Sequence, residues 1–368
     1  MHSDRETRRP CHARFAHIGV LALLLLSQDW KRVEHGLALT YPKDHGAHLE
    51  YRTEWWYLTG NLDGPAGERF GFQFTIFRSG LDPSAAEAGD SPLRVHHVYA
   101  GHLALTDVAA GRTRFAERLR RSGAGLARAA EDELDLALDD WTLRRDANDH
   151  LHLAASDPAQ GFGFAFELAP EKPLVLHGDA GVSTKGPEPG NASAYASWTR
   201  IDTTGTLTVD GRELIVRGAA WYDHEFGSSV LPDGVRGWDW FSLQLDDGRE
   251  LMLFALRRED GTPTEQSAGT LVERDGSART LARDDFRIEV QGRWKSPRSG
   301  GAYPARWTIE VPGEALRLEL APLVSDCELS SAATGVVYWE GPVAITGSTS
   351  GRGYAELTGY SNSMSKRF

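Results

Sequence analysis

The chain has 368 residues, of which 40% are hydrophobic and 25% charged, a balance typical of a folded globular protein with room for two domains. Forty Lys and Arg against 52 Asp and Glu give a formal net charge of −12. This acidic balance argues against nucleic acid as a partner and against more than peripheral contact with a membrane. Cys11 and Cys327, the two cysteines, are too few for a disulfide framework.

The N-terminal residues 1–38 are predicted to be a signal or targeting segment. Arg5, Arg8, Arg9 and Arg14 precede an uncharged apolar run at 18–26. A basic stretch before ~7–15 apolar residues is typical of a secretory signal, and a membrane span needs ~20. We therefore expect export to the periplasm or the cell exterior. An ordinary apolar helix, retained in the cytoplasm, is the alternative.

After residue 50 the sequence predicts short antiparallel strands. Apolar and small or polar residues alternate at 70–77, and Asp210-Gly211, Asp247-Gly248 and Pro312-Gly313 each separate two apolar runs as hairpin turns do. Strands with a turn every 8–12 residues predict an all-β sandwich or barrel. The Ala- and Arg-rich stretch Phe115–Glu133 is the one predicted helix, a short element of the first barrel.

An internal repeat divides the chain into two similar halves. Trp55–Arg78 and Trp238–Arg257 both read as an aromatic strand, an Asp-containing turn and an apolar strand that ends in Arg. Their first residues are 183 positions apart, about half the chain. Two copies of one β-barrel domain, 39–200 and 201–368, explain the repeat most economically.

The stretch 221–227 is the densest group of residues able to carry chemistry. On a strand, Tyr222 and His224 would share one face and Asp223 and Glu225 the other. Acidic and imidazole groups this close can transfer protons in a site closed to water. We therefore predict His224, Asp223, Glu225 and Tyr222 as catalytic candidates. A polar contact at the domain junction is the alternative.

Other patterns exclude common chemistries. His96 and His102 share a strand face but lie roughly 20 Å apart at 3.3 Å per residue, too far for one metal ion. His150 and His152 are predicted to face solvent, since Leu151 and Leu153 take the other face. Thr349 stands where a nucleophile elbow needs Ser, and no phosphate-binding loop or dinucleotide fingerprint occurs. We expect no metal and no cofactor.

Aromatic residues are the remaining candidates for binding. Most are expected to fill the cores of the β-domains, but barrels that hold a ligand line their cavity with such side chains. The predicted ligand-binding set is Trp55, Trp56, Tyr57, Trp221, Trp238, Trp240, Tyr99, Trp339 and Tyr354.

Several motifs in order resemble a known family over about residues 39–361. They are Glu54-Trp55-Trp56-Tyr57, the block 219–229, the run 237–241 and the C-terminal stretch 338–360. They are similar to the AttH-like proteins, which group with the carotenoid 1,2-hydratases (hydroxyneurosporene synthases). The resemblance implies two lipocalin-like antiparallel barrels packed together. Some relatives hydrate a terminal isoprenoid double bond, others are described as secreted hydrolases, and fungal relatives bind polyenes and steer cyclisations.

The resemblance also implies a hydration scheme without a cofactor, with His224 matching the family histidine and Asp223 beside it. An acid protonates the alkene, aromatic faces stabilise the cation and water adds. The hydratase pattern has Trp where this chain has Phe226, and Tyr-x-Asp where it reads Leu251-Met252-Leu253. These departures favour binding of an elongated isoprenoid- or lipid-like molecule over hydration. A structural module of the cell surface is the third possibility.

Overall fold

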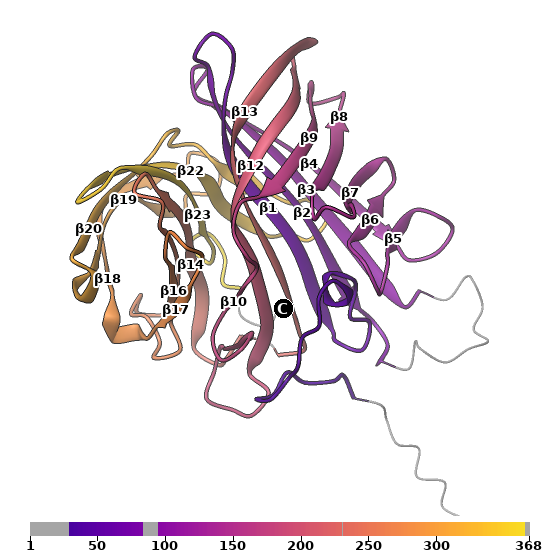
Figure 1. Cartoon of the computed structure of the whole chain (residues 1–368), viewed down its shortest axis with the longest axis horizontal. Coiled ribbons are helices and arrows are strands. Elements are labelled where there is room, and N and C mark those ends of the chain that lie inside the picture. The colour runs from indigo at the N-terminus through magenta and orange to yellow at the C-terminus, as the bar shows by residue number, and fades with distance from the viewer. Residues whose placement is uncertain (1–28, 84–94, 230, 365–368) are drawn as a thin grey trace, which may run out of the picture.

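A computed structural model describes residues 29–83, 95–229 and 231–364, and strands dominate it (Figure 1). They form two separate antiparallel sheets, each strongly curled into a near-barrel. The all-β prediction of two barrel-like antiparallel domains is therefore confirmed. None of the helices in this part of the chain combines the length and apolarity needed to cross a membrane. The signal-like run 18–26 and Cys11 lie outside the described residues.

The first sheet has thirteen strands and is built from the first two thirds of the chain. Its main path runs β4-β3-β2-β1-β13-β12-β9-β8-β7-β6-β5, and β10 and β11 pair with β12. In chain order the strands are β1 (Thr53–Asp63), β2 (Arg69–Gly80), β3 (His97–Asp107), β4 (Arg112–Arg121), β5 (Ala127–Ala129), β6 (Asp135–Leu138), β7 (Trp141–Arg145), β8 (Leu151–Asp157), β9 (Phe162–Pro170), β10 (Val175–Leu176), β11 (Val182–Thr184), β12 (Ala192–Val209) and β13 (Arg212–Gly227).

The second sheet has ten strands in the order β17-β16-β15-β14-β23-β22-β20-β19-β18, with β21 on β22. They are β14 (Val235–Leu245), β15 (Glu250–Arg258), β16 (Ala268–Val272), β17 (Ala278–Leu281), β18 (Arg287–Lys295), β19 (Ala302–Val311), β20 (Leu316–Pro322), β21 (Glu328–Ser330), β22 (Val337–Gly347) and β23 (Gly351–Leu357). Short 3₁₀ turns are η1 (Lys43–His45), η3 (Arg283–Asp285) and η4 (Pro312–Glu314).

The predicted repeat is visible in the topology. In each sheet the first strand, β1 or β14, pairs on one side with the strand that follows it and on the other with the last strand of the sheet, β13 or β23. Trp55 and Trp238 therefore occupy equivalent strands. Both belong to one cluster of apolar side chains packed between the two sheets.

Two details of the prediction are wrong. The boundary at 200/201 falls inside β12, and the hairpin β12–β13 belongs to the first sheet because β13 pairs with β1. The sheets divide between Gly227 and Val235. The predicted helix Phe115–Glu133 is instead part of β4, a connection and β5, with Arg114 and Ala116 buried on alternate positions against β3. Pairing with β3 outweighs the helical propensity of Ala and Arg here.

Each curled sheet encloses its own core. Alternate residues of the strands point inward, so the first core collects side chains such as Phe72, Trp141 and Leu168, and the second collects Phe241 and Trp307. The strands β1, β13 and β12 on one side and β14 and β23 on the other present their outer faces to each other. A third apolar cluster is buried there, between the two sheets.

Candidate functional site

Strand β13 separates the residues of the densest motif onto two faces, as predicted. Tyr222 belongs to the first core, and the His224 ring stacks on Trp56 of the same core at 5.0 Å between ring centroids. Trp221 belongs to the cluster between the sheets, on the face that also carries Asp223 and Glu225. The four catalytic candidates therefore lie in two environments rather than in one site.

On the inner face, His224 is part of a buried ion-pair network around Glu54. The Glu54 Oε1 atom lies 2.9 Å from His224 Nε2 and 2.9 Å from His48 Nδ1, and Arg78 Nε donates to Glu54 Oε2 at 2.9 Å. The Arg78 guanidinium also donates to the carbonyl oxygens of His48 and Tyr51. This network fixes the segment before β1 onto the first sheet.

The electrostatics of this network suit a structural role. Burial alone would raise the pKa of Glu54, but Arg78 and the bonds from His224 and His48 hold that pKa well below its usual range. Burial lowers the pKa of His224 although its bond to Glu54 favours the charged form. The ligand atoms of His48, Glu54 and His224 lie within 4.8 Å of one another, close enough to hold a metal ion. The Arg78 guanidinium, however, already supplies positive charge to this carboxylate.

On the outer face, two rows of side chains oppose each other across the space between the sheets. In the first sheet, Trp55, Glu225 and Tyr195 lie side by side as register partners on β1, β13 and β12. In the second sheet, Glu356, Trp240 and Phe254 are partners on β23, β14 and β15 in the same way. Directly opposite residues of antiparallel strands share a face. Each row therefore offers one carboxyl group and two aromatic rings. These rings belong to the buried apolar cluster between the sheets or pack against it, and we call this packed junction the intersheet cleft.

Several contacts join the two rows. The Trp240 indole Nε1 donates to the Tyr195 hydroxyl at 3.1 Å, and the ring of Trp240 meets that of Tyr57 edge to face at 5.3 Å. The Lys185 Nζ, from the connection between β11 and β12, lies 3.2 Å from Glu225 Oε1 and 4.1 Å from the centroid of the Phe254 ring. One ammonium thus bridges the rows.

Asp223 is the best-placed proton donor of the cleft. It accepts hydrogen bonds from the Tyr195 hydroxyl at 2.7 Å and the Trp221 indole at 2.6 Å, and from the Ser197 hydroxyl. Burial raises the pKa of Asp223 to about 7 against these bonds. Burial thus favours the protonated form of this carboxyl, the form that a general acid requires.

The second sheet adds two further carboxyl groups with raised pKa values. Glu340 and Glu356 are direct partners on β22 and β23, and Tyr57 donates to Glu340 from the first sheet. Burial raises the pKa of Glu356 to about 7, and burial beside Glu356 raises that of Glu340 well above its ordinary value. Trp238 Nε1 donates to Glu356 at 3.1 Å. Burial therefore favours the protonated form of carboxyl groups on both sides of the cleft.

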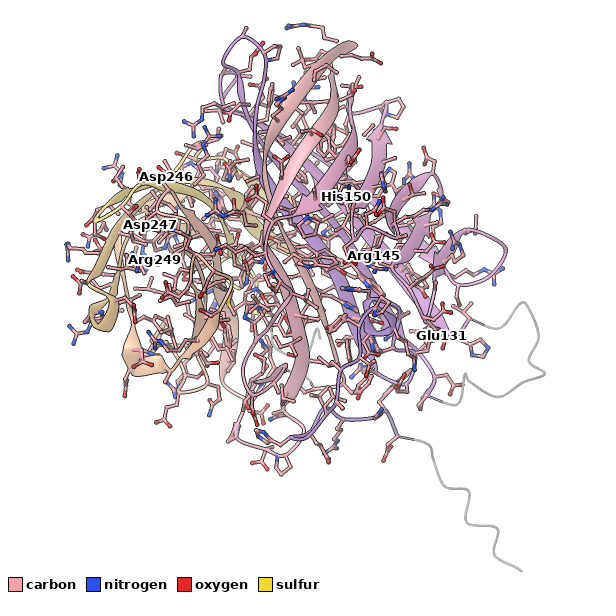
Figure 2. The ribbon with its side chains drawn as sticks, viewed as in Figure 1. Glu131, Arg145, His150, Asp246, Asp247 and Arg249 are labelled. Carbon is pink, nitrogen blue, oxygen red and sulfur yellow. The ribbon has the colours of Figure 1, made fainter. Side chains whose placement is uncertain are left out.

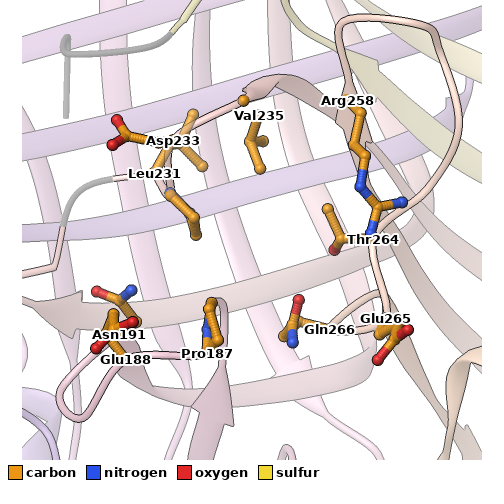
Figure 3. A pocket seen from close by; sticks show the side chains of 12 residues that line it. Pro187, Glu188, Asn191, Leu231, Asp233, Val235, Arg258, Thr264, Glu265 and Gln266 are labelled. Carbon is orange, nitrogen blue, oxygen red and sulfur yellow. The ribbon is translucent and has the colours of Figure 1, made fainter.

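A groove of about 630 Å³ opens beside the cleft (Figure 3). Its walls come from the connection before β12, the segment before β14 and the connection after β15. Leu231 and Val235 line the groove and also belong to the apolar cluster between the sheets. The groove thus borders the apolar cluster from the solvent side.

Comparison with known proteins shows which family has this architecture. The AttH-like family model matches residues 32–360. The chain belongs to the AttH-like family. A crystal structure of a protein assigned to AttH from Nitrosomonas europaea superposes with a TM-score of 0.81 at 35% identity, over 90% of this chain and 99% of the other. Kievitone hydratase from Nectria haematococca shares the fold, with a TM-score of 0.66 at 16% identity over 90% of this chain and 96% of that one. A search of curated proteins found no match.

Most of the predicted binding aromatics of this AttH-like protein lie in the cleft region. Trp55, Tyr57, Trp221, Trp238, Trp240 and Tyr354 belong to the cluster between the sheets. Trp56 and Tyr99 instead fill the first core, and Trp339 fills the second. These three side chains point inward because successive residues of a strand point to opposite faces, as the neighbours Trp55 and Trp56 do.

Four further histidines of the first sheet have polar partners. His102 Nδ1 lies 2.7 Å from the Tyr338 hydroxyl, and His97 Nδ1 lies 3.3 Å from Arg78, so these two serve different networks. His152 is exposed, as predicted, and His150 is half-buried beside Glu167. Figure 2 shows His150 on the first sheet, far from the β14–β15 turn that carries Asp246, Asp247 and Arg249.

Sequence reasoning missed several residues of the cleft and of the inner network. Glu54, Glu340 and Glu356 stand inside the aromatic motifs that carry the family resemblance. An acidic residue within two positions of an aromatic one on a strand is the signal that could have identified them. Lys185 and Tyr195 lie in no motif, and Phe254 lies only in the second copy of the repeat. The three meet in the cleft through contacts between residues distant in sequence.

Proposed function

We propose that this AttH-like protein binds an elongated apolar molecule, isoprenoid- or lipid-like, in the intersheet cleft. The supporting observation is the aromatic cluster between the two sheets, against which Trp55 and Trp238 pack while remaining partly exposed. Aromatic faces with a few directed polar groups are what small-molecule sites use.

The test is titration calorimetry with farnesol, a linear isoprenoid alcohol. Replacement of Trp238 by Ala removes a large ring from the cleft, and we expect it to weaken binding about tenfold, since aromatic anchors dominate the energetics of such contacts. The control is Ile215→Ala, which removes an apolar side chain that is 65% exposed on β13. Equal affinities of wild type and Trp238→Ala would overturn the proposal.

A second candidate is acid-catalysed hydration of the bound molecule, with Asp223 rather than His224 as the acid. The raised pKa of Asp223 and its place among Trp221, Tyr195 and Tyr57 favour it. In this scheme the Asp223 carboxyl gives its proton to one alkene carbon and the rings stabilise the cation on the other. A solvent water then adds there and returns a proton to the Asp223 carboxylate. The relative from Nectria haematococca is named a hydratase.

The same farnesol samples test this chemistry. A hydrated product gains the mass of one water, and Asp223→Asn should lower its formation by about 10²–10⁴-fold, the usual contribution of a positioned acid. Binding without any mass gain in the wild type would leave the protein a binder and exclude hydration of this substrate.

A further inference from the structure

Lys185 places a positive charge where a ligand would bind. Its Nζ lies 3.2 Å from Glu225 Oε1, 4.1 Å from the Phe254 ring centroid and 5.2 Å from the Tyr195 ring centroid. A carboxylate and two aromatic faces around one ammonium are the elements by which proteins bind organic cations. The cleft thus already contains a cation-binding arrangement, occupied by a side chain of the protein itself.

The Lys185 side chain can leave this position without unfolding its surroundings. Its backbone N–H donates to the Asn191 carbonyl at 2.7 Å, which fixes the main chain of the connection before β12. Its side chain is 17% exposed and reaches the cleft from a connection at the groove. Rotation about its side-chain bonds is therefore enough to carry the ammonium into solvent.

The charge of the groove favours the approach of a cation. Glu188, Asp233 and Glu265 line it against the single guanidinium of Arg258. Clefts lined by one sign of charge concentrate ligands of the opposite sign and repel those of the same sign. A fatty acid or another anionic amphiphile would meet these carboxylates, and Glu225 behind them.

We infer that the ligand of the intersheet cleft carries a cationic group, an amine or quaternary ammonium, on its apolar chain, and that this group replaces the Lys185 ammonium between Glu225 and Phe254. The inference rests on the proposed binding function and adds the class of headgroup to it. Lys185 is then a competitor within the chain, so its removal strengthens binding of the cation.

The experiment is titration calorimetry with three probes that share one tail: decyltrimethylammonium, 1-decanol and decanoate. In the wild type we expect decanoate to bind most weakly. Lys185→Ala should strengthen decyltrimethylammonium binding about tenfold and leave 1-decanol within about twofold. Glu225→Gln should weaken the ammonium probe by a similar factor, again with little change for 1-decanol.

Lys31→Ala is the matched control. Lys31 pairs with Glu50 at 3.3 Å and lies over the Tyr51 ring at 5.1 Å, the same kind of contact at a surface outside the cleft. It should change none of the three affinities. Unchanged or weaker ammonium binding in Lys185→Ala, or decanoate as the tightest probe, would overturn the inference. If none of the probes binds to any variant, the proposed binding function itself fails.

Discussion

At the scale of single residues, substitution of His224 distinguishes a structural role of this side chain from a catalytic one. Its partners are Glu54 and the stacked ring of Trp56, both within the first sheet, rather than a group across the junction between the domains. Loss of the imidazole leaves buried polar groups short of a partner, so His224→Ala should lower the free energy of unfolding by on the order of 1–3 kcal/mol. Urea unfolding measures this change.

The control for that variant is His152→Ala, because His152 is exposed and pairs with Asp146 at 3.0 Å on the surface. A surface substitution of this kind is expected to stay within about 0.5 kcal/mol. Farnesol affinity should be the same in both variants, since neither side chain faces the cleft. An unchanged melting temperature together with lost conversion of a polyene would show instead that His224 is catalytic.

At the scale of elements, close contact between β1 and β13 holds the cleft-bearing strand in place. A Cβ atom at Gly218 would lie 1.9 Å from the Asn61 carbonyl oxygen, so any side chain there pushes the two strands apart. We expect Gly218→Ala to destabilise the protein by about 1–3 kcal/mol, as overpacking does. Gly313→Ala, where nothing lies within 4 Å, should change stability little in the same thermal melt. Equal melts of the two variants would contradict this reading of β13.

Strand alternation is the part of the fold that sequence conveys best. The period of two placed Trp221, Asp223 and Glu225 on one face of β13 and Tyr222 and His224 on the other, as the structure has them. The stretch 115–133 shows the opposite case. Its Ala and Arg content favours a helix locally, whereas β4 forms because β3 lies beside it to pair with. Such pairing depends on tertiary context that local propensity does not contain.

At the scale of the whole molecule, the site could be predicted in part. The aromatic motifs and Asp223 were visible in the sequence, because short motifs carry them. Which other side chains join Asp223 between the sheets was not visible, because the outer faces meet only after each sheet has curled. Tyr195 and Phe254 come together across that space although they are 59 residues apart. The local sequence pattern around either residue does not show that the two lie close together in space.

The pKa values of the carboxyl groups between the sheets lead us to expect that the stability of the whole molecule depends on pH. Asp223 and Glu356 have pKa values raised to about 7, and burial beside Glu356 raises the pKa of Glu340 well above its ordinary value. A carboxyl whose pKa is higher in the folded state stabilises the fold at low pH, and this stabilisation is lost as pH rises through the folded pKa. Buried histidines such as His177, with its pKa lowered to about 3 by burial, oppose this trend below pH ~6.5 but not above it, where the unfolded histidine is also neutral.

Stability should therefore be highest near pH ~6 and should fall toward pH ~8, by up to about 1.4 kcal/mol per pH unit for each carboxyl that ionises. Calorimetric melts from pH 5 to 9 measure this directly. Glu340→Gln keeps a neutral side chain at this position and should flatten the decline above pH ~7, whereas Glu213→Gln, an exposed change on β13, should not. A wild-type melting temperature that is constant or rises between pH 6.5 and 8 would mean that these three carboxyls are already ionised in the folded protein. In that case the two sheets would be held together without the protons that we place between them.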